Sequence, residues 1–211
     1  RILPVKIMSR EGTGSTSDLI SGIRWAADRG ATVINMSVGG FPYTQGVQDA
    51  INYAWNKGIV LVGAAGNNNR EETFYPASMA NVVSVSATQR EDEFSHWSSY
   101  GPKVDVSAPG SSVQTTNCTV CTYADHHTWG AHTYISGTSF ATPNVAGVVA
   151  LIRARYPGCH AARHRDIGLL TQHIVAAAVL GIKADPDRGR SEDFRSVDEV
   201  RSPQPFQCKP D

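Results

Sequence analysis

Two short and mainly apolar runs, at residues 59–64 and 82–87, constrain the fold of this 211-residue chain more than any other feature. Runs of this length are typical of strands that are covered on both faces, which occur mainly in parallel sheets. A helical pattern precedes the first run: the apolar residues of 45–57 recur at i, i+3, i+4, i+7 and i+8. Strands joined by helices through right-handed crossovers predict an α/β fold, with a doubly wound, mostly parallel sheet and helices on both of its faces.

The sequence predicts one long helix in the second half of the chain. Residues 139–155 are small or aliphatic almost all round, which indicates a buried helix. Pro143 falls in its first turn, where a missing N–H removes no intrahelical hydrogen bond. The other elements expected from periodicity are strands at residues 4–8 and 33–36 and helices at residues 17–29 and 172–182.

The charge balance bears on the kind of partner. Lys and Arg together number 19, as do Asp and Glu, so the formal net charge is zero. A nucleic acid or an anionic membrane surface would require a basic face, so neither is expected as a partner. The longest apolar stretch, residues 174–182, is too short to cross a bilayer. The chain starts at Arg1 with no signal-peptide pattern, so we expect that upstream sequence was removed or lies outside this chain.

Four cysteines suit a secreted protein with disulfides, and they permit three pairings. They are Cys118, Cys121, Cys159 and Cys208. At the close pair Cys118 and Cys121 we expect a local disulfide or free thiols. The alternative is a zinc site with His126 or His127 as further ligands, although no second cysteine pair lies nearby.

Ser139 lies at the start of the buried helix, and Gly137 before it permits a tight turn. A serine there has its hydroxyl at the positive end of the helix dipole, and its backbone N–H has no partner within the helix. Such an N–H can hold a developing oxyanion, so Ser139 is a candidate nucleophile. The alternative is that Ser139 only caps the helix. The Gly-x-Ser-x-Gly pattern of α/β-hydrolases does not apply, because Ala141 takes its last position.

The longer string from Ser136 to Gly147, Ser-Gly-Thr-Ser-Phe-Ala-Thr-Pro-Asn-Val-Ala-Gly, closely resembles the nucleophile motif of the subtilisin-like serine proteases. That motif usually has Met at the position of Phe140 and His at that of Asn144, and neither position is catalytic. The resemblance extends in unbroken order over about residues 1–157. It implies a serine endopeptidase that hydrolyses peptide bonds through an acyl-enzyme at Ser139.

Further segments resemble other parts of the same family's site. Residues 60–67, Val-Leu-Val-Gly-Ala-Ala-Gly-Asn, resemble the strand that ends in the oxyanion-hole asparagine, which implies that role for Asn67. Taken alone, Asn67 could instead be a turn residue. Residues 33–40 resemble a strand that lines the substrate cleft, and Gly12-Thr13-Gly14 resembles the strand opposite.

The resemblance also implies a pocket for the side chain that precedes the scissile bond. Its two walls would be Ser37-Val38-Gly39 and Ala64-Ala65-Gly66. Because these walls carry no charge, we expect a neutral side chain there, apolar or aromatic. By the same alignment, Phe74 lies near the floor of the pocket and shortens it.

The rest of the family's triad is missing. In this family the order is Asp, His, Ser, and the Asp and His precede the segment that matches residues 1–8. Neither the family's Asp-x-Gly strand motif nor its His-Gly-Thr-His helix motif occurs here, and none of the seven histidines stands in a comparable context. We therefore expect the C-terminal portion of a peptidase domain at residues 1–157, and a divergent tail at 158–211 that is partly helical and then poorly ordered. Alone, the chain is expected to be inactive, marginally stable and prone to aggregate.

The resemblance implies no required cofactor, but several relatives bind structural calcium between a carboxylate and backbone carbonyls. By alignment, the carboxylate would be Asp105 and the carbonyls those of Ala80 and Val82. Asp105 could instead cap a turn.

The family resemblance further implies a protein or peptide substrate, secretion, and a monomer when the protein is intact. The first alternative is a non-catalytic subtilisin-like scaffold that binds peptides or partners. The second is an unrelated α/β hydrolase or binding domain, which the missing Gly-x-Ser-x-Gly elbow disfavours.

Overall fold

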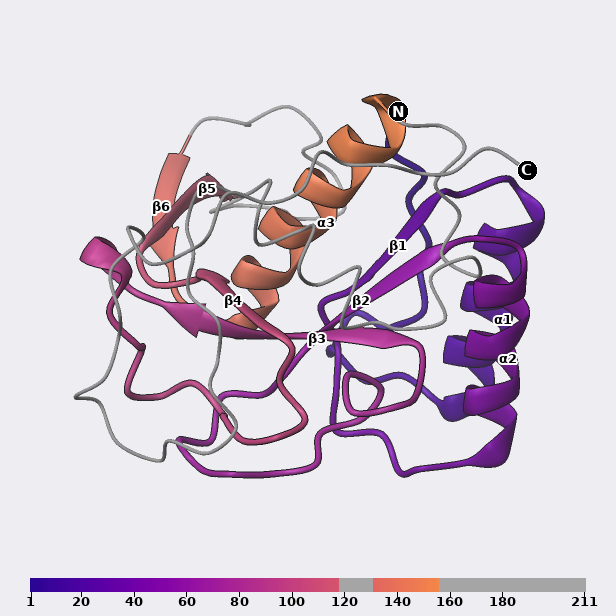
Figure 1. Cartoon of the computed structure of the whole chain (residues 1–211), viewed down its shortest axis with the longest axis horizontal. Helices are drawn as coiled ribbons and strands as arrows, with labels where there is room; N and C mark the ends of the chain where they lie inside the picture. Colours follow the sequence, from indigo (N-terminus) through magenta and orange to yellow (C-terminus); the bar gives the residue numbers. More distant parts are fainter. Residues whose placement is uncertain (118–130, 156–211) are drawn as a thin grey trace, which may run out of the picture.

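A computed structural model describes residues 1–117 and 131–155 of the chain (Figure 1). Its main sheet has four parallel strands in sequential order: β1 (Val33–Met36), β2 (Val60–Ala64), β3 (Val82–Thr88) and β4 (Val106–Pro109). A separate antiparallel hairpin consists of β5 (Val113–Asn117) and β6 (Ala131–Ile135).

Helices cover the main sheet. They are α1 (Thr16–Asp28), α2 (Gln45–Asn56) and α3 (Thr138–Arg155), with a short 3₁₀ turn, η1, at Arg90–Asp92. Helix α3 packs against all four strands, whereas α2 packs on β2, and α1 packs on α2 (Figure 1). Every residue of β2 and β3 is buried, so the centre of the sheet is covered on both faces. The predicted α/β class, a mostly parallel sheet with helices on both faces, is confirmed.

The first two helices begin where capping side chains place them. The Ser15 hydroxyl accepts a hydrogen bond from the Asp18 N–H, and the Asp18 carboxylate accepts one from the Ser15 N–H. This reciprocal capping box satisfies two N–H groups that the helix itself leaves unpaired. Thr44 caps α2 in the simpler way, by accepting from the Val47 N–H. Both helices match the predicted bounds to within one residue.

Two expectations from the sequence are wrong. Helix α3 is buried on one face, through residues such as Val145 and Val149, but not all round: Leu151 on its outer face is 72% exposed. Residues 4–8 form no strand in the described structure. Ile7 packs instead against α1, where a Cβ added to Gly22 would lie 2.5 Å from Cγ2 of Ile7. An apolar run has no backbone partner of its own, so only tertiary packing decides whether it joins a sheet.

Other expectations fall on residues that are not described. These are the helix at 172–182, the tail at 158–211, and Cys118, Cys121, Cys159 and Cys208. The disulfide, free-thiol and zinc alternatives, and the division after residue 157, therefore stay predictions.

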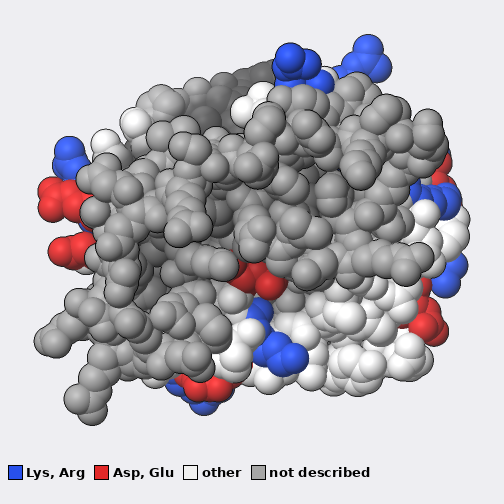
Figure 2. Space-filling view, in the orientation of Figure 1, with Lys and Arg blue, Asp and Glu red and all other residues white. Residues whose placement is uncertain are grey.

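The described surface mixes charges of both signs. On the face shown in Figure 2, both Lys and Arg side chains and Asp and Glu side chains appear among the described residues. This agrees with the zero net charge of the whole chain. None of the described helices combines the length and apolar character that crossing a membrane requires.

Candidate active site

The site forms where β1 and β2 end. Because the two strands are parallel and adjacent, their carboxyl ends lie at the same edge of the sheet. The N-terminus of α3 meets that edge: the Ser37 hydroxyl, just beyond β1, donates a 2.7 Å hydrogen bond to the carbonyl of Ser139. In return, the Ser139 hydroxyl lies 3.3 Å from the carbonyl of Ser37 and donates to it. This pair of contacts fixes the candidate nucleophile against the end of β1.

The backbone N–H of Ser139 is left open. The N–H groups on either side are occupied: that of Thr138 donates to Oδ1 of Asn67 at 2.9 Å, and that of Phe140 donates to the carbonyl of Gly137 at 2.9 Å. Within the described part of the chain, the Ser139 N–H has no acceptor. A helix N-terminus that presents an unpaired N–H can bind an anion or a developing negative charge.

Asn67 is held in one orientation by the same helix start. Its Oδ1 atom accepts two hydrogen bonds from Thr138, from the N–H and from the hydroxyl, both at 2.9 Å. Thr138 is itself fixed, because it is fully buried and its hydroxyl also accepts from the Gly66 N–H at 3.3 Å. With its oxygen committed to Thr138, the Asn67 side chain has only its Nδ2 group left to offer a ligand. A Cβ on Gly137 would lie 3.8 Å from Nδ2, which is ordinary van der Waals contact with this donor.

The two predicted pocket walls flank Ser139 and Asn67. One wall, residues 37–39, begins at the Ser37 contact, and the other, residues 64–66, leads directly into Asn67. Ala64 and Ala65 of the second wall are both buried. Gly66 has φ of +111°, a conformation that only glycine adopts easily, and its carbonyl accepts from the Ser99 N–H at 2.9 Å.

Phe74 lies between these two walls. A Cβ built on Gly39 would overlap Cε1 of the Phe74 ring and would lie 2.7 Å from Cδ1. A Cβ on Gly66 would lie 3.2 Å from Cγ of the same ring. The predicted position of Phe74 near this pocket therefore has geometric support.

A carboxylate that sequence reasoning missed stands behind the second wall. Glu72 accepts hydrogen bonds from Ser99 Oγ at 2.5 Å, from Asn68 Nδ2 at 2.9 Å and from Arg70 Nε at 3.0 Å. Its side chain is only 10% exposed. Burial alone would raise the pKa of this carboxyl, but the hydrogen bonds from these three residues outweigh it and hold the pKa below its ordinary value. Nothing in the local sequence, a polar loop, marks one of its two glutamates as buried.

Thr138 was also missed, although it directly precedes Ser139 in the motif. Its role depends on Asn67, which lies 71 positions away along the chain. The only sequence signal was adjacency to a candidate nucleophile at a helix start, where hydroxyl side chains commonly bind nearby backbone groups.

The predicted cleft strand at residues 12–14 lies in a different local setting. Ser9 donates its N–H to the carbonyl of Thr13 at 2.7 Å, and the Gly12 N–H donates to Ser9. Thr13 and Gly14 line a hollow of about 590 Å³ together with residues such as Met8. The contacts of this segment are therefore with its own neighbours along the chain, and its role in substrate binding stays a prediction.

The predicted calcium ligands lie near the start of β3. Oδ2 of Asp105 accepts from the Ser84 N–H at 2.8 Å, and the carbonyl of Ala80 accepts from Gln48 Nε2 at 3.0 Å. Burial raises the pKa of Asp105, against the opposing effects of the Ser84 hydrogen bond and the nearby charge of Lys103. No cluster of three or more His, Cys, Asp or Glu residues occurs in the described ranges, so a metal here would depend on carbonyls and water.

A parallel α/β sheet that brings a helix-start serine beside an asparagine amide defines the kind of site that serine hydrolases use. Comparison with known proteins identifies the family: a family model described as "Subtilase family" matches residues 1–197. The chain belongs to the subtilase family.

Comparisons with individual relatives support the same family. The chain is 44% identical to thermitase of Thermoactinomyces vulgaris over 154 residues, which cover 73% of this chain and 52% of that protein. It is 34% identical to subtilisin Savinase of Lederbergia lenta over 153 residues, which cover 72% and 53%. A solved cold-adapted subtilisin-like serine proteinase superposes with a TM-score of 0.64 at 32% identity, covering 83% of this chain and 57% of that one. The chain thus spans about half the length of these relatives.

Proposed function

We propose that the intact protein containing this chain is a serine endopeptidase that cleaves peptide bonds through an acyl-enzyme. The observation that carries the proposal is the pairing of two hydrogen-bond donors. Among residues 1–117 and 131–155, the Ser139 N–H has no acceptor, and the Asn67 amide is held through its oxygen by Thr138, so that Nδ2 is the donor it can offer. Two such donors are what a tetrahedral oxyanion requires.

The proposed steps follow the order of acyl transfer. The Ser139 hydroxyl attacks the scissile carbonyl while a histidine outside the described residues takes its proton. The Ser139 N–H and Asn67 Nδ2 then stabilise the oxyanion. Its collapse, with the histidine passing the proton to the leaving nitrogen, releases the amine and leaves an ester on Ser139, which water hydrolyses. The carbonyl of Ser37, the described acceptor of the Ser139 hydroxyl, orients that hydroxyl but cannot take up its proton.

That last contact favours a second candidate, a non-catalytic scaffold that binds peptides. The test uses the intact protein and its Ser139→Ala variant with an internally quenched peptide. The endopeptidase proposal predicts cleavage by the wild type and none by the variant, with peptide binding retained in both. A wild type that binds the peptide but never cleaves it would support the scaffold instead.

The proposal also covers the substrate class, the location and the oligomeric state of the protein. We infer a protein or peptide substrate, secretion and a monomeric state, the second supported by an even number of cysteines. A structural calcium ion at Asp105, with the carbonyls of Ala80 and Val82, is supported by the partly buried carboxylate close to the start of β3. The Ala80 carbonyl would have to share its lone pairs with Gln48.

A further inference from the structure

The Phe74 ring occupies the space between the two pocket walls. Its Cε1 and Cδ1 atoms face Gly39 in the first wall, and its Cγ atom faces Gly66 in the second. A peptide whose carbonyl lies between Ser139 and Asn67 must place the preceding side chain beside these same walls. This is because Ser37 contacts Ser139, and Gly66 directly precedes Asn67.

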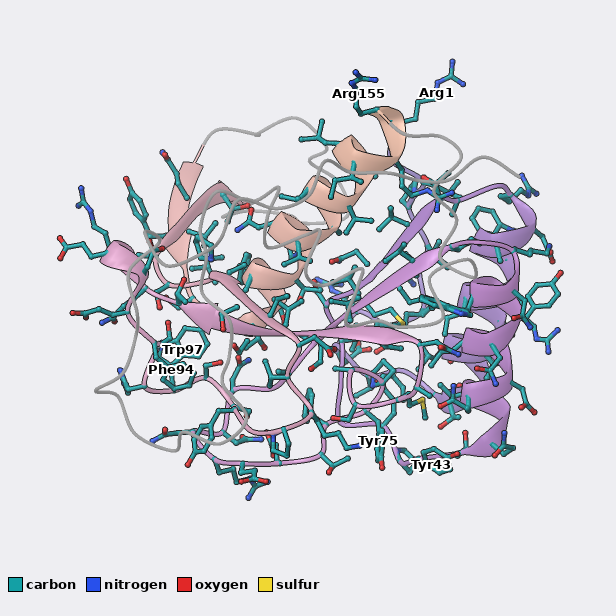
Figure 3. All side chains as sticks on the ribbon, viewed as in Figure 1. Arg1, Tyr43, Tyr75, Phe94, Trp97 and Arg155 are labelled. Atoms are coloured by element: carbon teal, nitrogen blue, oxygen red, sulfur yellow. The ribbon has the colours of Figure 1, made fainter. Side chains whose placement is uncertain are left out.

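The ring is held in this position by its backbone. The Phe74 N–H donates to Ser78 Oγ at 2.9 Å, and the Phe74 carbonyl accepts from the Ser78 N–H at 2.9 Å. The next residue, Tyr75, packs its ring on that of Tyr43 with 5.5 Å between centroids, and Figure 3 shows the two rings side by side. These contacts on both sides of Phe74 limit how far its ring can move away from the walls.

Gly39 and Phe74 fit one another. Gly39 does not have a positive φ, so its backbone does not require glycine. A Cβ at this position would overlap the Phe74 ring, so glycine is needed here for space. Gly66, in contrast, is needed both for its φ of +111° and for space.

The neighbouring carboxylate does not make this a pocket for basic side chains. Glu72 lies behind Gly66, where a Cβ would be 2.6 Å from its Oε1. Its oxygens already accept hydrogen bonds from Ser99, Asn68 and Arg70, and Arg70 also balances its charge. A Lys or Arg side chain would have to displace these partners.

We propose that Phe74 fills most of the pocket for the side chain before the scissile bond, so that the intact protein cleaves after small residues such as Gly, Ala and Ser. This inference rests on the proposed function. It replaces the aromatic side chain that uncharged walls alone would predict, because an aromatic ring and Phe74 cannot occupy the same space.

Peptide substrates test the proposal. A series of identical peptides that differ only in this residue is assayed with the intact wild type, Phe74→Gly and the conservative Phe74→Tyr. The wild type and Phe74→Tyr are expected to cleave after Ala at least about tenfold more efficiently than after Phe, measured as kcat/KM. In Phe74→Gly the emptied space should raise kcat/KM for the Phe peptide by about tenfold or more, with little change for Ala. Equal efficiency for the two peptides in the wild type, or an unchanged ratio in Phe74→Gly, would overturn the inference while leaving Ser139-dependent cleavage in place. If no peptide is cleaved, the proposed function and this inference fall together.

A second measurement does not depend on activity. Gly39→Ala is made in the wild type and in Phe74→Gly, and the four proteins are compared by thermal unfolding. The lowering of Tm by Gly39→Ala should be at least halved when the Phe74 ring is gone, because the two groups compete for one space. An equal effect in both backgrounds would show that the ring does not lie against Gly39, and it would refute the proposal on structural grounds alone.

Discussion

One oxygen atom, Oδ1 of Asn67, accepts both the backbone N–H and the hydroxyl of Thr138, each at 2.9 Å. The two contacts leave Nδ2 as the free donor of the amide and tie it to the helix that carries Ser139. An amide that would otherwise rotate in a loop is thereby preorganised before substrate arrives, and it needs no rearrangement as charge develops.

The hydroxyl of Thr138 should therefore matter to the rate more than to binding. Thr138→Val keeps the backbone contact but removes the hydroxyl, and we expect kcat to fall by about tenfold with KM nearly unchanged, the size of one net hydrogen bond. Thermal stability should also fall, since the Gly66 N–H loses its acceptor. Thr138→Ser, which restores the hydroxyl, should recover most of kcat. A Val variant whose loss lay entirely in KM would contradict a positioning role.

Asn67 itself should act almost wholly on the chemical step. Asn67→Leu in the intact protein should lower kcat by about a hundredfold to a thousandfold with little change in KM, a magnitude taken from the loss of one such donor in subtilisin itself. Steady-state kinetics on one peptide substrate measure both constants. Full retention of kcat would remove Asn67 from the oxyanion site and return it to the role of a turn residue.

Because of Glu72, the stability of the protein should depend on pH in the acid range. The folded pKa of Glu72 lies below the ordinary value of 4.5, so the ionised form is favoured by folding. Its contribution is fully present above about pH 4.5 and is lost as the pH falls through the lower folded pKa. Thermal unfolding from pH 7 to pH 3 should show wild type and Glu72→Gln differing most at neutral pH and converging at the acid end. A difference that stays constant over this range would rule out the linkage.

Calcium binding tests the proposed role of Asp105 as a calcium ligand. Titration calorimetry and thermal unfolding should show calcium binding and a raised Tm in the wild type, and neither in Asp105→Asn. Asn can still accept the Ser84 hydrogen bond, so the fold should persist. Because folding raises the pKa of Asp105, its charge opposes folding once the pH rises above the ordinary value of 3.8. In the absence of calcium, the neutral Asn variant should therefore be no less stable at pH 7. A calcium-dependent shift that survives in Asp105→Asn would place the ion elsewhere.

Much of the sheet could be predicted because its signals are local. The run at 59–64 is apolar throughout and the run at 82–87 is apolar except for Ser84 and Ser86, and caps such as Ser15 and Thr44 mark helix starts directly. The strand predicted at residues 4–8 failed for the converse reason: its apolar side chains found a partner in α1 rather than in a neighbouring strand. The local sequence pattern does not determine whether such a segment packs on a helix or pairs with a strand.

The site depends on contacts between distant residues, and periodicity says nothing about those. Ser139 and Ser37 are 102 positions apart, and Thr138 and Asn67 are 71 apart. The family resemblance implied the roles of Ser139, Asn67 and the two pocket walls. It did not indicate that Thr138 orients the Asn67 amide. The burial of Glu72 and the fit between Phe74 and Gly39 likewise appear only in three dimensions.

The proposed peptidase mechanism requires Ser139 to be an activated nucleophile in the intact protein. Labelling with a fluorophosphonate probe, read by mass spectrometry of the modified peptide, tests this directly. We predict stoichiometric modification at Ser139 in the intact protein, none in Ser139→Ala, and none in the isolated 211-residue chain, where a serine without a neighbouring base is a weak nucleophile. Failure of the intact protein to react at Ser139 would contradict the proposed protease. Stoichiometric labelling of the isolated chain would show instead that one of its own seven histidines serves as the base.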